Sequence, residues 1–183
     1  IQPLMSIDRI AVVGGGTMGN GIAHVFALSG REVTIVDLNQ DVLDESLSTI
    51  EANLTRQEKK DRISTDEKDA ALDRIRTSTD IADGVAEVDL VVEAVSETME
   101  VKASVFQQLD EHAPDHAILA SNTSSISITA LGAETSRPQK VIGMHFFNPV
   151  PVMKLVEIVR GLVTSDDAYE TVEALAEDLG KTP

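Results

Sequence analysis

Three glycines between a short apolar run and a helical pattern constrain the fold of this chain more than any other feature. The run at 9–13 is rich in β-branched residues, and the segment Gly14-Gly-Gly-Thr-Met-Gly19 follows it directly. Apolar residues then recur at helical spacing to position 28, and a second β-rich run ends at Asp37. Strand, glycine turn, helix and strand in this order predict a βαβ unit with two parallel strands.

Two helical patterns follow the second strand. Apolar residues keep helical spacing from Val42 to about Lys60. Ser64, with Glu67 three residues later, has the pattern of a capping box that opens another helix toward Ile75. We therefore expect a charged helical hairpin, over about residues 40–76, inserted after the second strand.

Strands and helices continue to alternate farther along the chain. Two β-rich runs, 88–92 and 117–120, flank a helical pattern over 99–112. This alternation predicts an α/β fold of the Rossmann type, with a doubly wound and mostly parallel sheet. The β-rich runs 141–147 and 152–159 are separated by only four residues, so they predict an antiparallel hairpin, and a last helix is expected over 166–179.

Composition narrows the class of protein. A length of 183 residues without an interdomain linker predicts one domain over 1–183. The chain has no cysteine, which excludes disulfides, thiolate zinc sites and a cysteine nucleophile, and no His, Asp and Glu cluster has metal-ligand spacing. The net charge of -16 disfavours nucleic acid. Without a signal peptide or a long apolar run, we expect a soluble, cytoplasmic protein that binds no membrane.

The glycine turn also predicts a ligand. Gly14 makes the turn, Gly16 leaves room for a pyrophosphate to approach the backbone, and Gly19 lets the helix pack closely. The N-terminus of that helix offers free N–H groups to an anion. Asp37 stands about 20 residues on, where an acid binds the ribose 2′-hydroxyl and repels a 2′-phosphate. We therefore predict NAD rather than NADP; the alternative is a structural glycine turn beside a solvated carboxylate.

A histidine in the predicted C-terminal hairpin is the candidate catalyst. His145 and Glu157 each stand six residues from Pro151, so a hairpin centred there brings them opposite one another. Imidazole titrates near neutral pH, which makes histidine the usual general base, and a paired carboxylate can orient it. The alternative is a histidine that only fills the core.

The sequence resembles the L-3-hydroxyacyl-CoA dehydrogenases over nearly its whole length. Four motifs occur in that family's order: Gly-Gly-Gly-Thr-Met-Gly at 14–19, Val-Val-Glu-Ala at 91–94, Ser-Asn-Thr-Ser-Ser at 121–125, and His-Phe-Phe-Asn-Pro-Val-Pro-Val-Met-Lys-Leu-Val-Glu at 145–157. The resemblance implies NAD-dependent oxidation of a (3S)-3-hydroxyacyl-CoA to the 3-ketoacyl-CoA, in fatty-acid β-oxidation or hydroxybutyryl-CoA metabolism.

The resemblance also assigns residues. It makes His145 the base, Glu157 its partner, and Asn148 and Ser124 part of the same catalytic site, with Ser124 near both the substrate and the nicotinamide. It adds Gly15, Thr17 and Met18 to the cofactor loop. Glu97 and Lys102 match positions that contact the cofactor, although the pair could equally be solvated at the start of a helix. Lys60, which could equally be a solvated charge, and Asn53, where the family usually has serine, match coenzyme A contacts in the helical hairpin.

The family's chains continue beyond a Gly-Lys turn like that at 180–181. The resemblance implies an all-helical domain there that mediates homodimer formation and closes the acyl-CoA cleft. Without it we expect NAD binding but little activity, because hydride transfer needs a positioned substrate and excluded water. A non-catalytic or partner-dependent NAD-binding module is the alternative. A related dehydrogenase of small β-hydroxy acids is disfavoured by the His-Phe-Phe-Asn-Pro segment.

Overall fold

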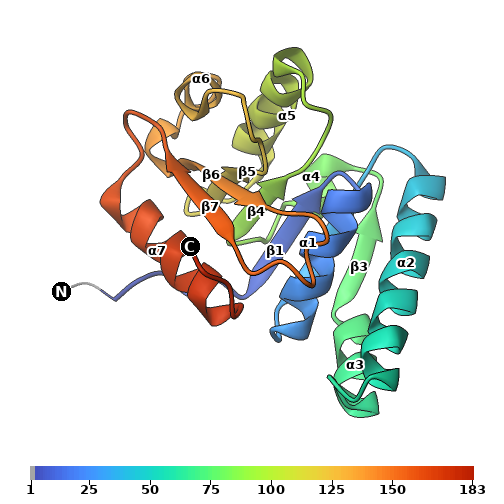
Figure 1. Ribbon diagram of the computed structural model, residues 1–183. Helices are drawn as coiled ribbons and strands as arrows, with labels where there is room; N and C mark the ends of the chain where they lie inside the picture. The colour runs from blue at the N-terminus through green and yellow to red at the C-terminus, as the bar shows by residue number, and fades with distance from the viewer. Residues whose placement is uncertain (1–2) are drawn as a thin grey trace.

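The computed structural model describes residues 3–183 and shows one sheet with helices on both faces (Figure 1). Its seven strands run in the order β3-β2-β1-β4-β5-β6-β7, and only β7 is antiparallel to its neighbour. The strands are β1 (Arg9–Val13), β2 (Glu32–Val36), β3 (Ile75–Ser78), β4 (Leu90–Glu93), β5 (Ile118–Ser121), β6 (Val141–Phe146) and β7 (Val156–Arg160). The helices are α1 (Thr17–Leu28), α2 (Gln40–Lys59), α3 (Thr65–Asp73), α4 (Ile81–Gly84), α5 (Met99–His112), α6 (Ile128–Ala133) and α7 (Asp166–Asp178), with a 3-10 turn η1 (Pro138–Lys140).

The predicted doubly wound α/β fold is confirmed. From β1 the chain proceeds to β2 and β3 on one side, then returns to β4 beside β1 and continues to β5 and β6 on the other. The carboxyl ends of β1 and β4 therefore form the topological switch point, where open α/β sheets bind their ligands. The residues that the sequence singled out lie mainly at this edge of the sheet.

Two apolar layers hold the helices against the sheet. One contains side chains from α1, α2 and α7, and the other contains side chains from α4, α5 and α6. β4 and β5 are buried along their whole length and β1 along all but its first residue, which explains their uninterrupted apolar runs. No helix within residues 3–183 is long and apolar enough to cross a membrane.

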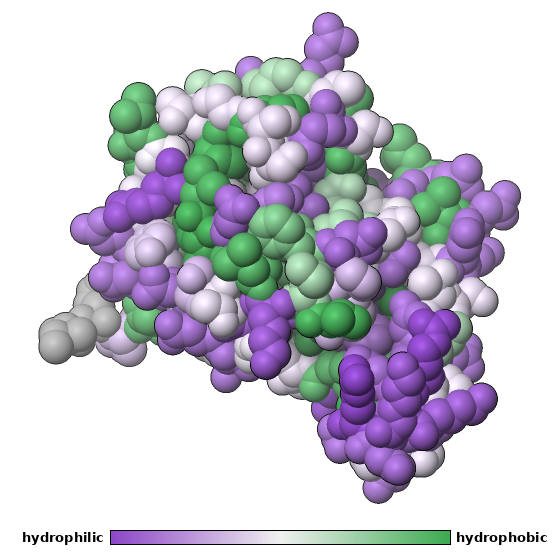
Figure 2. Space-filling view, viewed as in Figure 1, coloured by the Kyte–Doolittle hydropathy of each residue, from purple (hydrophilic) through white to green (hydrophobic). Residues whose placement is uncertain are grey.

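The helical hairpin is confirmed, with one correction at its end. Ser64 Oγ accepts a hydrogen bond from the Glu67 amide, and the Glu67 carboxylate accepts one from the Ser64 amide, as the capping pattern predicts. The second helix stops at Asp73, however, and Ile75 and Arg76 belong to the edge strand β3. Pairing with β2 decides this conformation, and four residues are too few to show strand periodicity. Figure 2 shows strongly hydrophilic residues over the far end of this hairpin.

The C-terminal hairpin is also confirmed, including the opposition of His145 and Glu157. Its second strand begins at Val156 rather than at Val152, because the amides of Val152 and Met153 both donate to the carbonyl oxygen of Pro149 and form a turn. Apolar residues on β7 and in the turns beside it are exposed, among them Val152, Leu162 and Val163. The sequence patterns did not predict the short helices α4 and α6.

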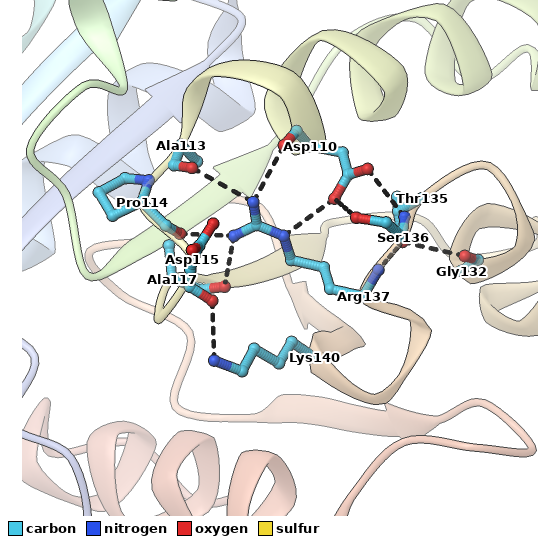
Figure 3. Close-up of polar contacts among 10 residues, drawn as sticks. All are labelled: Asp110, Ala113, Pro114, Asp115, Ala117, Gly132, Thr135, Ser136, Arg137 and Lys140. Atoms are coloured by element: carbon cyan, nitrogen blue, oxygen red, sulfur yellow. Dashed lines mark hydrogen bonds and ion pairs between the residues drawn. The ribbon is translucent and has the colours of Figure 1, made fainter.

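A buried arginine connects the end of α5 to the segment before β6 (Figure 3). The Arg137 side chain donates to the Asp110 carboxylate at 2.9 Å and to the carbonyl oxygens of Asp110 and Ala113 at 3.0 and 3.2 Å. It also donates to the carbonyl oxygens of Pro114 at 2.5 Å and Ala117 at 3.4 Å. Because the last carbonyls of a helix have no partner within it, this guanidinium takes the place of a C-terminal cap.

Candidate active site and cofactor site

The glycine loop between β1 and α1 is crowded at two glycines and open at the third. Gly14 has a φ of 107°, and a Cβ added there would lie 2.6 Å from the Ala94 carbonyl oxygen. A Cβ on Gly19 would lie 1.7 Å from the Gly14 carbonyl oxygen. At Gly16, the N-cap of α1, an added Cβ meets nothing within 4 Å. Gly14 therefore lets the loop approach the segment after β4, Gly19 lets α1 pack against the start of the loop, and Gly16 faces space that a ligand can occupy.

The electrostatics of this loop suit an anion. The first amides of a helix have no partner within the helix, and the macrodipole places positive charge there. The first turn of α1 contains no acidic residue. The strongly acidic chain thus places no carboxylate within the first turn of this helix, which suits a pyrophosphate site.

Asp37 stands at the carboxyl end of β2, and its two oxygens are oriented by the backbone. Oδ2 accepts from the Gly15 amide at 2.9 Å, and Oδ1 accepts from the Asn39 amide at 3.1 Å. The carboxylate is therefore tied to the glycine loop while remaining half-buried at the edge of the sheet. A freely solvated side chain, the alternative for Asp37, does not describe this geometry.

A cavity of about 820 Å³ lies at the switch point between β1 and β4. Gly14, Gly16, Thr17, Met18 and Asp37 line it, together with apolar side chains from α4, α5 and the segment after β2, namely Leu38, Val42, Ile81, Val101 and Val105. Ser96, Glu100, Ser104 and Gln108 line it as well, so that polar groups are combined with a mainly apolar wall, as in cofactor sites. These residues fit a dinucleotide: backbone amides for the pyrophosphate, Asp37 for a ribose hydroxyl and apolar side chains for a base.

Behind the cavity lies a buried ion pair that the sequence interpretation missed in part. The Lys102 ammonium donates to Glu93 Oε2 at 2.6 Å, and the two side chains are 1% and 0% exposed. Glu93 also accepts from the Ser121 hydroxyl at 2.6 Å and from the Val95 amide at 2.7 Å. The view of Lys102 as a solvated charge is therefore wrong. The signal for Glu93 was an acidic residue ending a fully apolar strand, since a buried carboxylate requires partners.

Glu97 connects this network to the segment after β5. Its carboxylate accepts from the Thr123 hydroxyl and from the Ser124 amide, the latter at 3.5 Å, and it lies 3.9 Å from the Lys102 ammonium. Ser124 itself is exposed. Glu97, Lys102 and Ser124 do not line the cavity directly, so the structure places them around the site rather than in its wall.

His145 and Glu157 face each other across β6 and β7. Their Cα atoms are register partners, and His145 Nδ1 lies 3.8 Å from Glu157 Oε1, slightly beyond hydrogen-bonding distance. The imidazole is 18% exposed and its ring centre lies 4.5 Å from that of Phe147. The Phe146 amide donates to Asn122 Oδ1 at 2.7 Å, which joins the strand end carrying His145 to the segment carrying Ser124. The histidine thus stays accessible while its neighbours are held.

The two residues that the resemblance assigned to coenzyme A, Asn53 and Lys60, lie apart. Asn53 lines a smaller cavity, of about 360 Å³, together with the candidate catalytic residue Asn148, between the N-terminus of α1, α2 and the turn at 148–151. Lys60 is exposed at the end of α2, seven residues beyond Asn53 and so about 10 Å farther along the helix. It takes no part in this cavity.

The doubly wound sheet, the glycine loop and the acidic residue ending β2 define an NAD-binding domain of the Rossmann type. Residues 9–183 match the family described as 3-hydroxyacyl-CoA dehydrogenase, NAD binding domain. The chain belongs to this family, and NAD is its cofactor.

The relatives agree with this family. A probable 3-hydroxybutyryl-CoA dehydrogenase of Bacillus subtilis is 45% identical over 97% of this chain and 62% of its own length. The human mitochondrial hydroxyacyl-coenzyme A dehydrogenase is 42% identical over 97% of this chain and 58% of its own. The crystal structure of (S)-3-hydroxybutyryl-CoA dehydrogenase from Ralstonia eutropha matches with a TM-score of 0.94 and 47% identity, covering 97% of this chain and 62% of that one. The chain thus spans about three-fifths of the length of these relatives.

Proposed function

We propose that this chain carries the NAD site and the catalytic base of a (3S)-3-hydroxyacyl-CoA dehydrogenase. The observation that supports this most directly is the opposition of His145 and Glu157 at the carboxyl edge of the sheet that also holds the dinucleotide cavity. The membership of the chain in this family supports the same reaction.

The proposed chemistry divides between the cofactor and two side chains. NAD, when bound, supplies the acceptor for the hydride that leaves C3 of the substrate. His145 takes the proton of the 3-hydroxyl, and the electron pair of that O–H bond forms the ketone. Glu157 stabilises the resulting imidazolium, for which the two side chains must approach by less than 1 Å from their separation of 3.8 Å.

The surrounding polar groups would orient the substrate. Ser124 and Asn148 are exposed in segments that adjoin the end of β6, where a hydroxyl and an amide can contact the reacting end. Asn53 shares a cavity with Asn148, which gives a path from the catalytic turn toward α2 for the coenzyme A portion. The Lys60 ammonium is the candidate contact for a phosphate at the far end of that path.

The test is NADH formation from (3S)-3-hydroxybutyryl-CoA, with the 3R enantiomer in parallel. It uses this chain and a chimera in which the C-terminal part of the Bacillus subtilis relative follows residue 183. The chimera supplies the part of the relatives that this chain does not span. Single-turnover conditions with excess enzyme make a slow reaction measurable. NAD affinity, measured by calorimetry, reports separately on the cofactor site.

We expect His145→Gln to lower the rate of the chimera by about 10²- to 10⁴-fold with NAD affinity unchanged, since the base acts in the chemical step. His112→Gln, at an exposed histidine on α5, is the matched control and should retain the full rate. NAD binding without oxidation of either enantiomer would instead support a non-catalytic NAD module. An equal rate for His145→Gln would show that another group is the base.

A further inference from the structure

Lys181, in the Gly-Lys turn that follows α7, contacts the turn that joins the two candidate catalytic strands. Its ammonium donates to the carbonyl oxygens of Val150 and Met153, each at 2.6 Å. These two carbonyls lie on either side of Pro151, at the centre of the segment between His145 and Glu157. A residue remote in sequence thus holds the middle of the catalytic hairpin.

The ammonium of Lys181 binds backbone carbonyl oxygens and no carboxylate within residues 3–183. None of the ion pairs found within residues 3–183 includes it. Burial lowers the pKa of Lys181 from its ordinary value, because the partly buried ammonium has lost some of its hydration. Hydrogen bonds from a charged donor are stronger than those between neutral groups, so two of them hold the turn firmly.

The opposite side of the same turn is in close contact with α1. A Cβ added to Gly21 would lie 2.9 Å from Val150 Cβ, and Val150 is only 2% exposed. The main chain of Thr182 adds two further bonds, donating to the Lys154 carbonyl oxygen at 2.7 Å and accepting from the Val156 amide at 3.0 Å. The turn is thus enclosed between α1 and the segment 181–182.

We propose that Lys181 is a positioning residue that fixes the turn between β6 and β7, and through it the approach of Glu157 to His145 and the placement of Asn148. This inference rests on the proposed function of His145. The ion pair has less than 1 Å to close, so a loosened turn spreads the two side chains over unproductive separations. Lys181 touches neither the glycine loop nor the cavity at the switch point, so NAD binding should not depend on it.

The first test is amide hydrogen exchange in the wild-type chain, Lys181→Met and Lys181→Arg. We expect protection of the Val152 and Met153 amides, which donate to the Pro149 carbonyl oxygen, to fall by about tenfold or more in Lys181→Met. Lys181→Arg retains the positive charge and should therefore keep part of this protection from exchange. Lys154→Met removes an exposed lysine from the same turn and is the matched control. Unchanged protection in folded Lys181→Met overturns the inference.

A measurement without substitution covers the case in which Lys181→Met does not fold. The ammonium of Lys181 in the wild-type chain should give a slowly exchanging 15N signal in NMR, because its protons are engaged by two carbonyls. The solvent-exposed lysines, whose ammonium protons exchange rapidly with water, are the reference. If the Lys181 ammonium exchanges as rapidly as theirs, the inference is overturned.

The second test separates positioning from simple stabilisation. In the chimera we expect Lys181→Met to lower the single-turnover rate by about ten- to a hundredfold at unchanged NAD affinity, since small displacements at a reacting centre have effects of this size. If Lys181→Met loses exchange protection in the turn but the chimera that carries it reacts at the wild-type rate, the positioning role is overturned. If the wild-type chimera oxidises no substrate, the proposed function fails, whereas the exchange experiment still decides whether Lys181 holds the turn.

Discussion

Replacing Lys102 by methionine should destabilise the fold far more than a surface substitution does. The methionine keeps most of the volume but leaves the Glu93 carboxylate buried, with only the Ser121 hydroxyl and the Val95 amide as donors. Breaking a buried ion pair by removing one partner costs about 3–5 kcal/mol. Two of the three donors to Glu93 remain, so we expect about 3 kcal/mol for Lys102→Met.

The second substitution tests whether the unpaired charge is the cause. Glu93→Gln in the Lys102→Met background removes that charge, while the amide can still bond to Val95 and Ser121. We expect the double variant to recover about 2 kcal/mol, a coupling within the range for residues in direct contact. Each single variant buries one charge without its partner. We therefore expect Lys102→Met and Glu93→Gln each to be less stable than the double variant.

The assay is urea unfolding followed by circular dichroism, with the slopes compared to confirm two-state behaviour. Arg9→Met, which breaks exposed ion pairs with Glu32 and Glu87, should cost about 1 kcal/mol or less. Calorimetry should show weaker NAD binding by Lys102→Met, because the segment after Glu93 lines the cavity. Additive effects of Lys102→Met and Glu93→Gln would refute the reasoning from a buried charge.

Three further outcomes follow from the geometry. Gly19→Ala should weaken NAD binding by about tenfold or more in calorimetry, because its Cβ would lie 1.7 Å from the Gly14 carbonyl oxygen and must displace the loop. Arg137→Met should lower the free energy of unfolding by about 3 kcal/mol, since the Asp110 carboxylate keeps only its hydrogen bonds from Ser136 and the carbonyls at the end of α5 lose their donor (Figure 3). The third outcome concerns the loss of stability at acidic pH. Burial raises the pKa of Asp110, but hydrogen bonds from Ser136 and Arg137 outweigh it and hold that pKa below its ordinary 3.8. This stabilisation is present above pH 3.8 and is lost as the pH falls through the lowered pKa, so Asp110→Asn should show a shallower loss of stability in acid titrations.

Local rules explain why much of the cofactor site could be predicted from sequence. A glycine turn between a strand and a helix, and an acid at the end of the next strand, depend only on neighbours in the chain. The opposition of His145 and Glu157 was likewise predictable, because hairpin pairing keeps an equal count of residues on both sides of the turn. That register is correct although the second strand begins four residues later than expected.

The missed features depend on distant partners. The strand β3 exists because β2 offers it an edge, and its four residues carry no periodic pattern. The partners of Glu93 come from α5 and β5, and those of Lys181 come from a turn about thirty residues away. Only the folded chain shows that Lys102 forms a buried ion pair with Glu93 and is not exposed at the start of a helix.

By itself the sequence determined the order of the longer strands and helices, the dinucleotide loop and the pairing of the candidate base with its carboxylate. These follow from side-chain size, backbone freedom and spacing along the chain. The tertiary structure decided which charges are buried, which loops they hold and how closely His145 and Glu157 approach. The physical reason is that desolvation and hydrogen bonding of a buried charge depend on groups that only folding brings together.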